Sequence, residues 1–461
     1  MQREECIMIK KIFTIILALV LASSLFACGN NENYSSIGND DSADVDKNDE
    51  LSIDTDSSTT TFVSGSNERN EPITPIKYIV PSRTHTVAIT TGGTLLAWGE
   101  NSSGQLGDGT TEDRNSPVII MNNVTSAATS GRSTFAITNN GELWGWGYNF
   151  SGQLGDGTTE NRHNPVKIMD NVANVFSYHY RTFAITNNGE LWGWGGGRLG
   201  DGTIERRHSP VKIMNDVISL SGLGNQAITS DGTLWGWNTG TEMELSPVKI
   251  MDNVASSVML GGLVFAVTNN GELWGWGWVD GCYGTLGDGT LDMKYSPVKI
   301  MDNVASVVTN GRGGHSHPSL YGSRTFAITN NGELWGWGDD RSGVIGNGSN
   351  EISPIPSQIM DNVASVVIGE TITFAITNNG ELWGWGWNIY NFLGTNVPGD
   401  IQSPTRIMNN VASFVTYDTR AYAILTNGEL IGWGNGLQRL LAPEVIVSNE
   451  GFTGWGIEIE T

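Results

Sequence analysis

One nine-residue stretch, "NNGELWGWG", occurs five times without change, beginning at Asn139, Asn187, Asn269, Asn330 and Asn378. An enzyme needs its catalytic residues once, so identical copies spread over hundreds of residues indicate an architectural repeat. The second tryptophan of the stretch, or its equivalent, marks eight units, at Trp98, Trp146, Trp194, Trp237, Trp276, Trp337, Trp385 and Trp433. The commonest spacing between these markers is 48 residues. The chain is therefore predicted to consist of eight related units.

Each unit contains four short segments that are typical of strands, shown from Val172 onward by "VANVF", "TFAIT", "ELWGW" and "PVKIM". They are rich in β-branched and aromatic residues. Between the second and third segments lies "NNG", whose Asn-Gly pair is expected to supply positive φ angles for a tight hairpin turn. Four antiparallel strands per unit, repeated with a period in the forties, predict an all-β fold, a β-propeller.

The order of these motifs carries a family resemblance. The pattern "GELWGWG", then N-x-x-G-Q-L-G-D-G-T, then "SPV", resembles the repeat of the regulator of chromosome condensation family, over residues 76 to 447. The resemblance implies a propeller that is characteristically seven-bladed, whereas this sequence shows eight units. We expect eight blades, with seven as the alternative if one unit is shared or displaced. The family also implies guanine-nucleotide exchange on a small GTPase.

The first residues have the features of an export signal. Lys10 and Lys11 precede the apolar run 12–26, which is too short for a comfortable membrane span, and the run closes with "LFAC" at Cys28. This ending resembles the lipobox of bacterial lipoproteins, in which the cysteine is lipidated; an ordinary cleaved signal is the alternative. Residues 1–27 are thus a predicted signal peptide, 28–71 a disordered acidic linker poor in large apolar residues, and 72–461 the propeller.

Charge and motif content narrow the function. The formal net charge is -23, which disfavours binding to nucleic acid. The match of Gly195, Gly197 and Gly200 to a dinucleotide fingerprint precedes no predicted helix, so no cofactor is expected. The "GDGT" turns at Asp108, Asp156, Asp201 and Asp288 offer one carboxylate each and are interpreted as caps, not metal sites. His315 and His317 make only a weak zinc hypothesis, and no metal is expected.

Residues that are identical in every unit are assigned to the fold. In "WGW", the glycines Gly145 and Gly147 should leave room beside a strand, and Trp144 and Trp146 should fill the gap to the neighbouring blade. Burying one tryptophan removes about 150 to 250 Å² from water, which at about 25 cal/mol per Å² is worth up to about 4 to 6 kcal/mol. These tryptophans are therefore predicted to hold the ring together.

Recognition is expected where the units differ. In an up-and-down blade, the connection between strands one and two and that between strands three and four leave on the same face, and both are variable here. Tyr, Trp and Arg, the types enriched at interface hot spots, gather in them. The predicted partner-binding residues are Tyr148, Phe150, Tyr178, Tyr180, Arg181, Trp278, Tyr283, Arg341, Trp387, Tyr390, Phe392 and Tyr417. Arg132, Arg324 and Arg420 lie in or beside the same connections. Some of the aromatic residues could instead only pad blade edges.

The sequence thus favours a non-catalytic, monomeric, surface-tethered module that binds a protein or a glycan, lipid-anchored to the outside of a bacterial membrane. Two alternatives are exchange activity on a small GTPase and inhibition of an enzyme by the aromatic loops. An export signal argues against the first, because such GTPases are intracellular. No nucleophile, base and acid occur at matched positions, so a hydrolase is the weakest interpretation.

Overall fold

The computed structural model describes residues 75–238, 244–277, 284–310, 323–369, 371–388, 392–395, 399–417, 420–434, 440–448 and 451–452. The signal and linker segments predicted above, with Cys28, lie outside these residues. The part of the chain that the structure describes contains no helix with the length and apolarity that crossing a bilayer requires.

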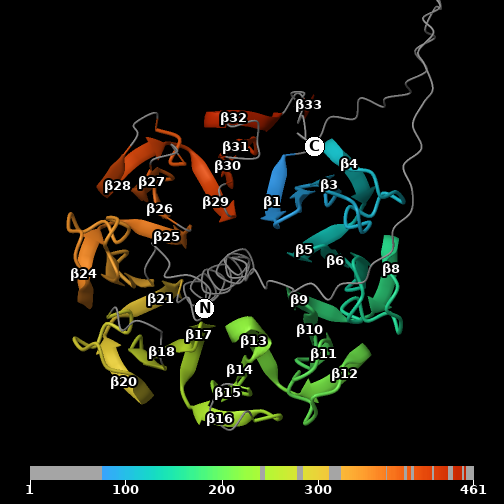
Figure 1. The fold of residues 1–461 in the computed structure, drawn as a ribbon, viewed down its shortest axis with the longest axis horizontal. Coiled ribbons are helices and arrows are strands. Elements are labelled where there is room, and N and C mark those ends of the chain that lie inside the picture. The colour runs from blue at the N-terminus through green and yellow to red at the C-terminus, as the bar shows by residue number, and fades with distance from the viewer. Residues whose placement is uncertain are drawn as a thin grey trace, which may run out of the picture.

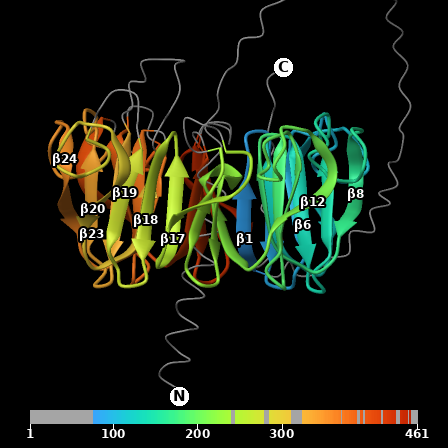
Figure 2. The same cartoon turned by 90° about the horizontal axis from the view of Figure 1, so that it is seen from below.

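Eight antiparallel sheets are arranged around a central axis and form a disc (Figures 1 and 2). Each sheet is one blade and takes its strands from one continuous segment of the chain, in the order of the sequence. The first strand of each blade lies nearest the axis and the fourth lies on the rim (Figure 1). The prediction of an eight-bladed propeller is confirmed, and no blade is shared between units.

Blades 1 to 4 consist of β1 (Ile76–Pro81), β2 (His85–Thr90), β3 (Leu95–Gly99) and β4 (Arg114–Met121); β5 (Val124–Ser130), β6 (Ser133–Thr138), β7 (Leu143–Gly147) and β8 (Arg162–Met169); β9 (Val172–Tyr178), β10 (Arg181–Thr186), β11 (Leu191–Gly195) and β12 (Arg207–Met214); and β13 (Val217–Ser221), β14 (Gln226–Thr229), β15 (Leu234–Gly236) and β16 (Val248–Met251). A short 3₁₀ helix, η1 (Gly222–Gly224), joins β13 to β14.

Blades 5 to 8 consist of β17 (Val254–Leu260), β18 (Leu263–Thr268), β19 (Leu273–Gly277) and β20 (Lys294–Met301); β21 (Val304–Thr309), β22 (Arg324–Thr329), β23 (Leu334–Gly338) and β24 (Ser353–Met360); β25 (Val363–Ile368), β26 (Ile372–Thr377), β27 (Leu382–Trp387) and β28 (Asp400–Met408); and β29 (Val411–Tyr417), β30 (Arg420–Leu425), β31 (Leu430–Gly434) and β32 (Leu440–Ser448). Blade 8 carries an additional strand, β33 (Gly451–Phe452), paired with β32.

The two faces of the disc differ in regularity. We call the face with the hairpins between strands two and three the turn face; each of its eight hairpins has four residues between the strands, and each of its seven crossovers between blades has two. In the "NNG" hairpins only the glycine has positive φ, for example 79° at Gly141, while Asn140 accepts a hydrogen bond from Thr138 Oγ1. The positive φ expected of each Asn-Gly is therefore supplied by its glycine. Asparagine takes positive φ in the crossovers instead, as Asn171 does at 63°.

The second tryptophan of each "WGW" forms the contact between blades. Trp146 of β7 is fully buried and belongs to one apolar cluster with Val87 and Leu95 of blade 1. Its indole Nε1 donates to the carbonyl oxygen of Gln105 in blade 1 at 3.0 Å. A Cβ at Gly107 would lie 2.6 Å from this Nε1, so the loop can cross the indole only as glycine. The framework role predicted for the second tryptophan is confirmed; Trp144 packs against the same cluster but is only half-buried.

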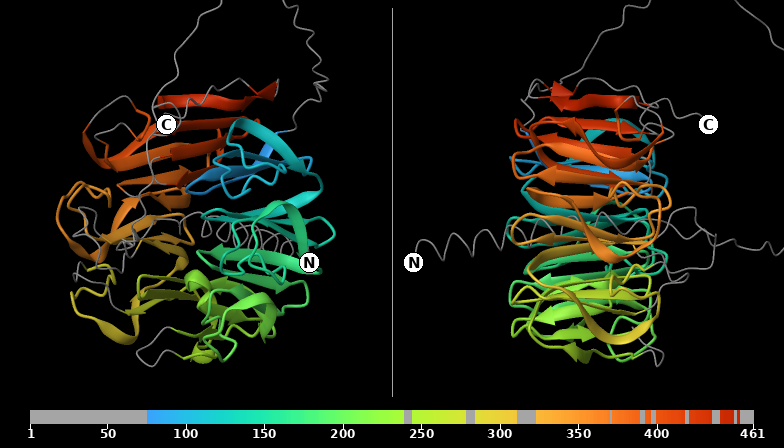
Figure 3. Two further views of the ribbon diagram at one scale, coloured as in Figure 1. Left: turned by 45° about the vertical axis from the view of Figure 1, so that its right-hand side comes forward. Right: turned by 90° about the vertical axis from the view of Figure 1, so that its left-hand side faces the viewer.

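The ring closes by contact between blade 8 and blade 1, which lie side by side in Figures 1 and 3. The Ile76 N–H donates to the Gly428 carbonyl at 3.1 Å, and Arg420 Nη2 donates to the Ser82 carbonyl at 2.6 Å. Ile79 of β1 and Tyr422 of β30 share one buried cluster. The two ends of the repeat array are thus joined by side chains and two turns, without exchange of a strand.

Candidate partner-binding face

The opposite face, which we call the loop face, carries the connections between strands one and two and between strands three and four. These connections vary in length: for example, the connection between the third and fourth strands is 100–113 in blade 1 and 196–206 in blade 3. The topology therefore places the variable segments on one side, as the sequence predicts.

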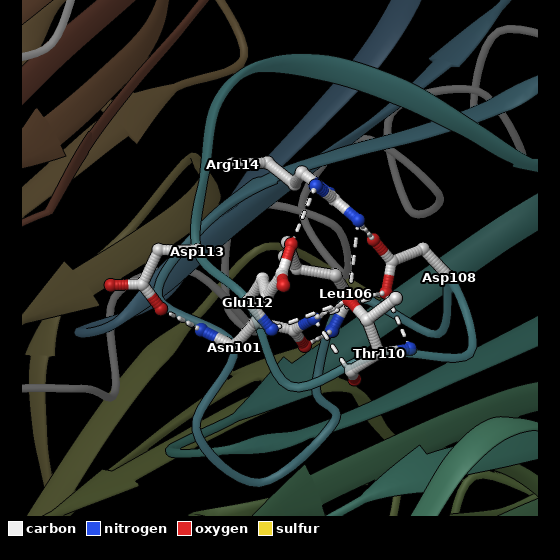
Figure 4. Close-up of polar contacts among 7 residues, drawn as sticks. All are labelled: Asn101, Leu106, Asp108, Thr110, Glu112, Asp113 and Arg114. Atoms are coloured by element: carbon white, nitrogen blue, oxygen red, sulfur yellow. Dashed lines mark hydrogen bonds and ion pairs between the residues drawn. The ribbon is translucent and has the colours of Figure 1, made fainter.

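A repeated polar network holds the longer connections rigid, shown for blade 1 in Figure 4. Asn101 is buried; its Oδ1 accepts from the Leu106 N–H at 2.9 Å and its Nδ2 donates to Asp108 Oδ1 at 3.1 Å. Asp108 also accepts from the Thr110 N–H at 3.0 Å and from Arg114 Nε at 2.6 Å. Burial raises the pKa of the Asp108 carboxyl, but hydrogen bonds from Thr110 and Arg114 outweigh it and hold that pKa below its ordinary value.

The whole network recurs in blade 2 around Asn149, and its Asp–Thr–Arg part recurs in blade 3, with the ion pairs Arg162–Asp156 at 2.6 Å and Arg207–Asp201 at 2.7 Å. The interpretation of the "GDGT" aspartates as caps is confirmed. The ion pairs that three of them form with arginine were not predicted from the sequence. Among the described residues no three His, Cys, Asp or Glu side chains are placed to hold a metal ion. His315 and His317 lie outside the described residues.

Four of the predicted aromatic binding residues lie in blades 2 and 3. Tyr148 and Phe150 follow β7 and stack with ring centroids 6.5 Å apart, and Phe150 is 66% exposed. Tyr178 and Tyr180 lie at the β9–β10 connection, and Tyr180 is 52% exposed. Between them His179, at φ 51°, packs edge-on against Tyr178 with centroids 4.4 Å apart. We call these five residues the aromatic group of blades 2 and 3.

The two halves of this group lie on segments that are bonded to each other. Thr182 Oγ1, at the start of β10, donates to the Gln153 carbonyl in the loop that carries Phe150, at 2.9 Å. The β5–β6 connection of blade 2 also approaches blade 3, because Ser130 Oγ donates to the His179 carbonyl at 3.4 Å. The aromatic side chains are thus presented by loops that the inter-blade contacts fix. The sequence analysis did not predict His179, although this residue lies between the predicted residues Tyr178 and Tyr180.

The arginines of the loop face are engaged within the protein. Arg181 Nη1 donates to Asn225 Oδ1 of blade 4 at 2.9 Å, and burial lowers the pKa of its guanidinium. Arg324 and Arg420 take the same place at the start of a second strand and donate to carbonyl groups of the next blade, at Gly369 and Ser82. Arg341 is ion-paired with buried Asp339. These residues therefore stabilise the ring or its loops, a role that the sequence prediction did not give them.

The remaining predicted residues are less accessible or are not described. Tyr417, in β29, is only 7% exposed, so the expectation that it crowds the surface was wrong: it lies in an inner strand beside the next blade. Trp387 and Phe392 are half-buried, and the Phe392 carbonyl accepts from Trp433 Nε1 of blade 8 at 2.9 Å. Trp278, Tyr283 and Tyr390 lie outside the described residues.

Comparison with known proteins supports the repeat assignment. A family model described as the regulator of chromosome condensation (RCC1) repeat matches residues 92–137, 140–179 and 331–376, and a second model of the same description matches 124–153 and 363–391. No curated protein matches the chain by sequence.

Several solved structures share the fold. Prp20p from Saccharomyces cerevisiae, in a study of its binding to Gsp1p and histones, is 20% identical, with a TM-score of 0.50 over 74% of this chain and 89% of that one. The yeast RCC1 protein Prp20 bound by Kap60 is 18% identical, with a TM-score of 0.50 over 80% and 94%. Human WBSCR16 is 18% identical, with a TM-score of 0.50 over 77% and 94%. At these identities the likeness is one of fold.

Proposed function

We propose that this chain, an eight-bladed propeller in which two regions match the RCC1 repeat model, is a non-catalytic binding module that holds a protein partner on its loop face. The aromatic group of blades 2 and 3 is the proposed centre of that contact. The fold supplies a rigid ring, and the binding specificity resides in the loops that differ between its repeats.

The exposure of Phe150 and Tyr180 carries this proposal. Both are large aromatic side chains more than half exposed. Aromatic side chains of limited rotamer freedom are the usual anchors of protein interfaces. The loops beneath them are fixed by the hydrogen bond from Thr182 to Gln153, so little ordering would oppose binding.

We further propose that the module acts outside the cell, lipid-anchored at Cys28 and separated from the membrane by the acidic linker. The support is the sequence: a charged and apolar leader that ends in "LFAC". In this setting the partner is a surface or secreted protein. A glycan, a small GTPase and the active site of an enzyme are the competing targets, and the binding experiment below distinguishes them.

The experiment uses residues 72–461 as bait for surface and secreted proteins of the source organism, followed by affinity measurement with the captured partner. Phe150→Ala and Tyr180→Ala should each weaken binding by roughly 1 to 4 kcal/mol, as interface anchors do. Tyr295→Ala is the matched control, because Tyr295 is 79% exposed but lies on the rim strand β20. Binding that tolerates both loop-face changes, or that is lost only with Tyr295, would refute the proposed surface. Inhibition of a captured enzyme, accelerated nucleotide release or capture of glycan alone would identify the competing functions.

A further inference from the structure

One loop of the repeat contains an acid where its counterparts contain an amide. Asp340, two residues after β23, occupies the position of Asn101, Asn149 and Asn388 in blades 1, 2 and 7. Each of these asparagines is fully buried and uses its Oδ1 to accept from the backbone N–H five residues later, at 2.9 Å. Asp340 is also fully buried and accepts from the Ile345 N–H in the same way, at 2.7 Å.

The second side-chain atom distinguishes the acid from the amides. Asn101 Nδ2 donates to Asp108 Oδ1 and to the Thr110 carbonyl, each at 3.1 Å, and Asn149 Nδ2 makes the equivalent pair of bonds. The site therefore requires a donor at this atom. In blade 6 the atom is Asp340 Oδ2, which is buried and has no hydrogen-bond partner. A carboxylate has no proton to donate, and a carboxylic acid has one.

Two residues around this position differ in blade 6, and the two changes act in opposite directions on a charged Asp340. The residue equivalent to Asp108 is Asn347, so the loop has lost the carboxylate that would repel a charged Asp340. Asn347 Oδ1 still accepts from the Ser349 N–H at 2.8 Å, and the turn keeps its shape. The residue equivalent to Arg114 is Ser353, so the cation that this network contains in blade 1 is missing, and the cation that faces Asp340 is the buried Arg324.

We propose that Asp340 is a protonation switch in the loop face: as a neutral acid it imitates the asparagine and locks the blade 6 loop, and on ionisation it releases that loop. In the neutral state Oδ1 accepts from Ile345 and the Oδ2–H takes the donor role of Asn101 Nδ2. Loss of the proton leaves a buried anion whose Oδ2 has no hydrogen-bond donor. The proposal is independent of the partner proposed above.

The charges that face Asp340 oppose one another. Burial raises the pKa of the Asp340 carboxyl, the Ile345 hydrogen bond and the buried Arg324 guanidinium of β22 lower it, and Asp339 raises it, with a result of about 7. Asp339 is itself paired with Arg341. Since the folded pKa lies above the ordinary value of 3.8, stability conferred by the proton is complete below about pH 4 and is lost as the pH rises toward and through 7.

The test is amide hydrogen exchange in the full chain between pH 5 and pH 8.5, corrected for the intrinsic pH dependence of exchange. In the wild type, protection of the Ile345 amide should fall by up to about 100-fold between pH 5 and pH 7, because an opening that restores the ordinary pKa of 3.8 gains about tenfold per pH unit until the folded pKa of about 7 is reached. Protection should change little above that pH. Asp340→Asn should fold, since blades 1, 2 and 7 use asparagine here, and should keep its protection at both pH values. The Leu154 amide of blade 2 is the internal control.

A second variant introduces the buried aspartate, and with it the expected pH dependence, into blade 1. Asn101→Asp should make protection of the Leu106 amide fall as the pH rises, because Leu106 donates to Asn101 Oδ1 in the wild type. His85 is another buried group that titrates. Burial, and to a smaller extent the charge of Arg420, lowers the pKa of His85 to about 3, and this residue is the same in all variants. Equal pH dependence at Ile345 in wild type and Asp340→Asn would overturn the proposal, as would a Leu106 amide in Asn101→Asp that stays protected throughout.

Discussion

Replacing Trp146 with alanine tests the claim that tryptophans between blades hold the ring together. Trp146 has no exposed surface and packs with Val87 and Leu95 of the preceding blade. Removing a fully buried tryptophan typically lowers the free energy of unfolding by about 3 to 5 kcal/mol, through lost apolar contact and the cavity that remains. We expect Trp146→Ala to lie in this range.

The lost hydrogen bond adds little to that figure. The Gln105 carbonyl accepts from Trp146 Nε1 at 3.0 Å and also from Thr134 Oγ1 at 2.7 Å. In the variant the carbonyl keeps the threonine, so no buried acceptor is left without a donor, and the large penalty for an unsatisfied group does not apply. The effect of the substitution is thus mainly one of packing.

The measurement is urea unfolding followed by tryptophan fluorescence, with amide exchange in β2 and β6 to detect local opening at the junction of blades 1 and 2. Trp144→Ala is the matched control, because Trp144 has the same side chain two residues earlier and is only half-buried. It should lower stability less. A Trp146→Ala protein that unfolds at the wild-type urea concentration, or a greater loss for Trp144→Ala, would refute the assignment.

Three further outcomes are expected. Cys28→Ser should release the protein from the membrane fraction and abolish lipid labelling, and retention in that fraction would contradict the anchor. Deleting residues 29–70 should leave the melting temperature nearly unchanged, because such a segment buries little apolar area, and a large drop would mean that it packs on the propeller. The free energy of unfolding should fall as the pH drops below about 4, because the folded pKa of Asp108 lies below its ordinary value of 3.8 and protonation removes the stabilisation that the carboxylate provides. In urea titrations at pH 6 and pH 3, Asp108→Asn should lose less stability between the two pH values than the wild type does.

Much of the fold could be predicted because related copies of one repeat occur eight times in the sequence. The eight tryptophan markers predicted eight blades, with seven as the alternative, and the structure has eight. The segments "VANVF", "TFAIT", "ELWGW" and "PVKIM" lie in β9 to β12. In the hairpin the expected positive φ belongs to Gly141, and the Asn140 side chain accepts a hydrogen bond from Thr138 Oγ1 that the sequence pattern did not predict. Local turn chemistry of this kind depends on side-chain bonds that a residue pattern does not contain.

The candidate site was predicted only in part, because exposure depends on contacts between blades. Phe150 and Tyr180 have the exposure that the sequence argument requires, whereas Tyr417 is buried against a neighbouring strand. Arg181 has the residue type of an interface anchor but reaches Asn225 of the next blade. Sequence alone gives the residue type and the face, and the distance to the adjacent repeat decides whether a side chain is free for a partner.

The seam between blade 8 and blade 1 has a consequence for how such a chain can change over generations. Every blade is one uninterrupted segment, so no blade combines strands from both ends of the repeat array. The two ends meet through contacts such as that of Arg420 with Ser82. Duplication or loss of one repeat in the gene would therefore add or remove a whole blade and leave the others intact. The near-identical copies of "NNGELWGWG" are what recent duplication of such units would leave behind.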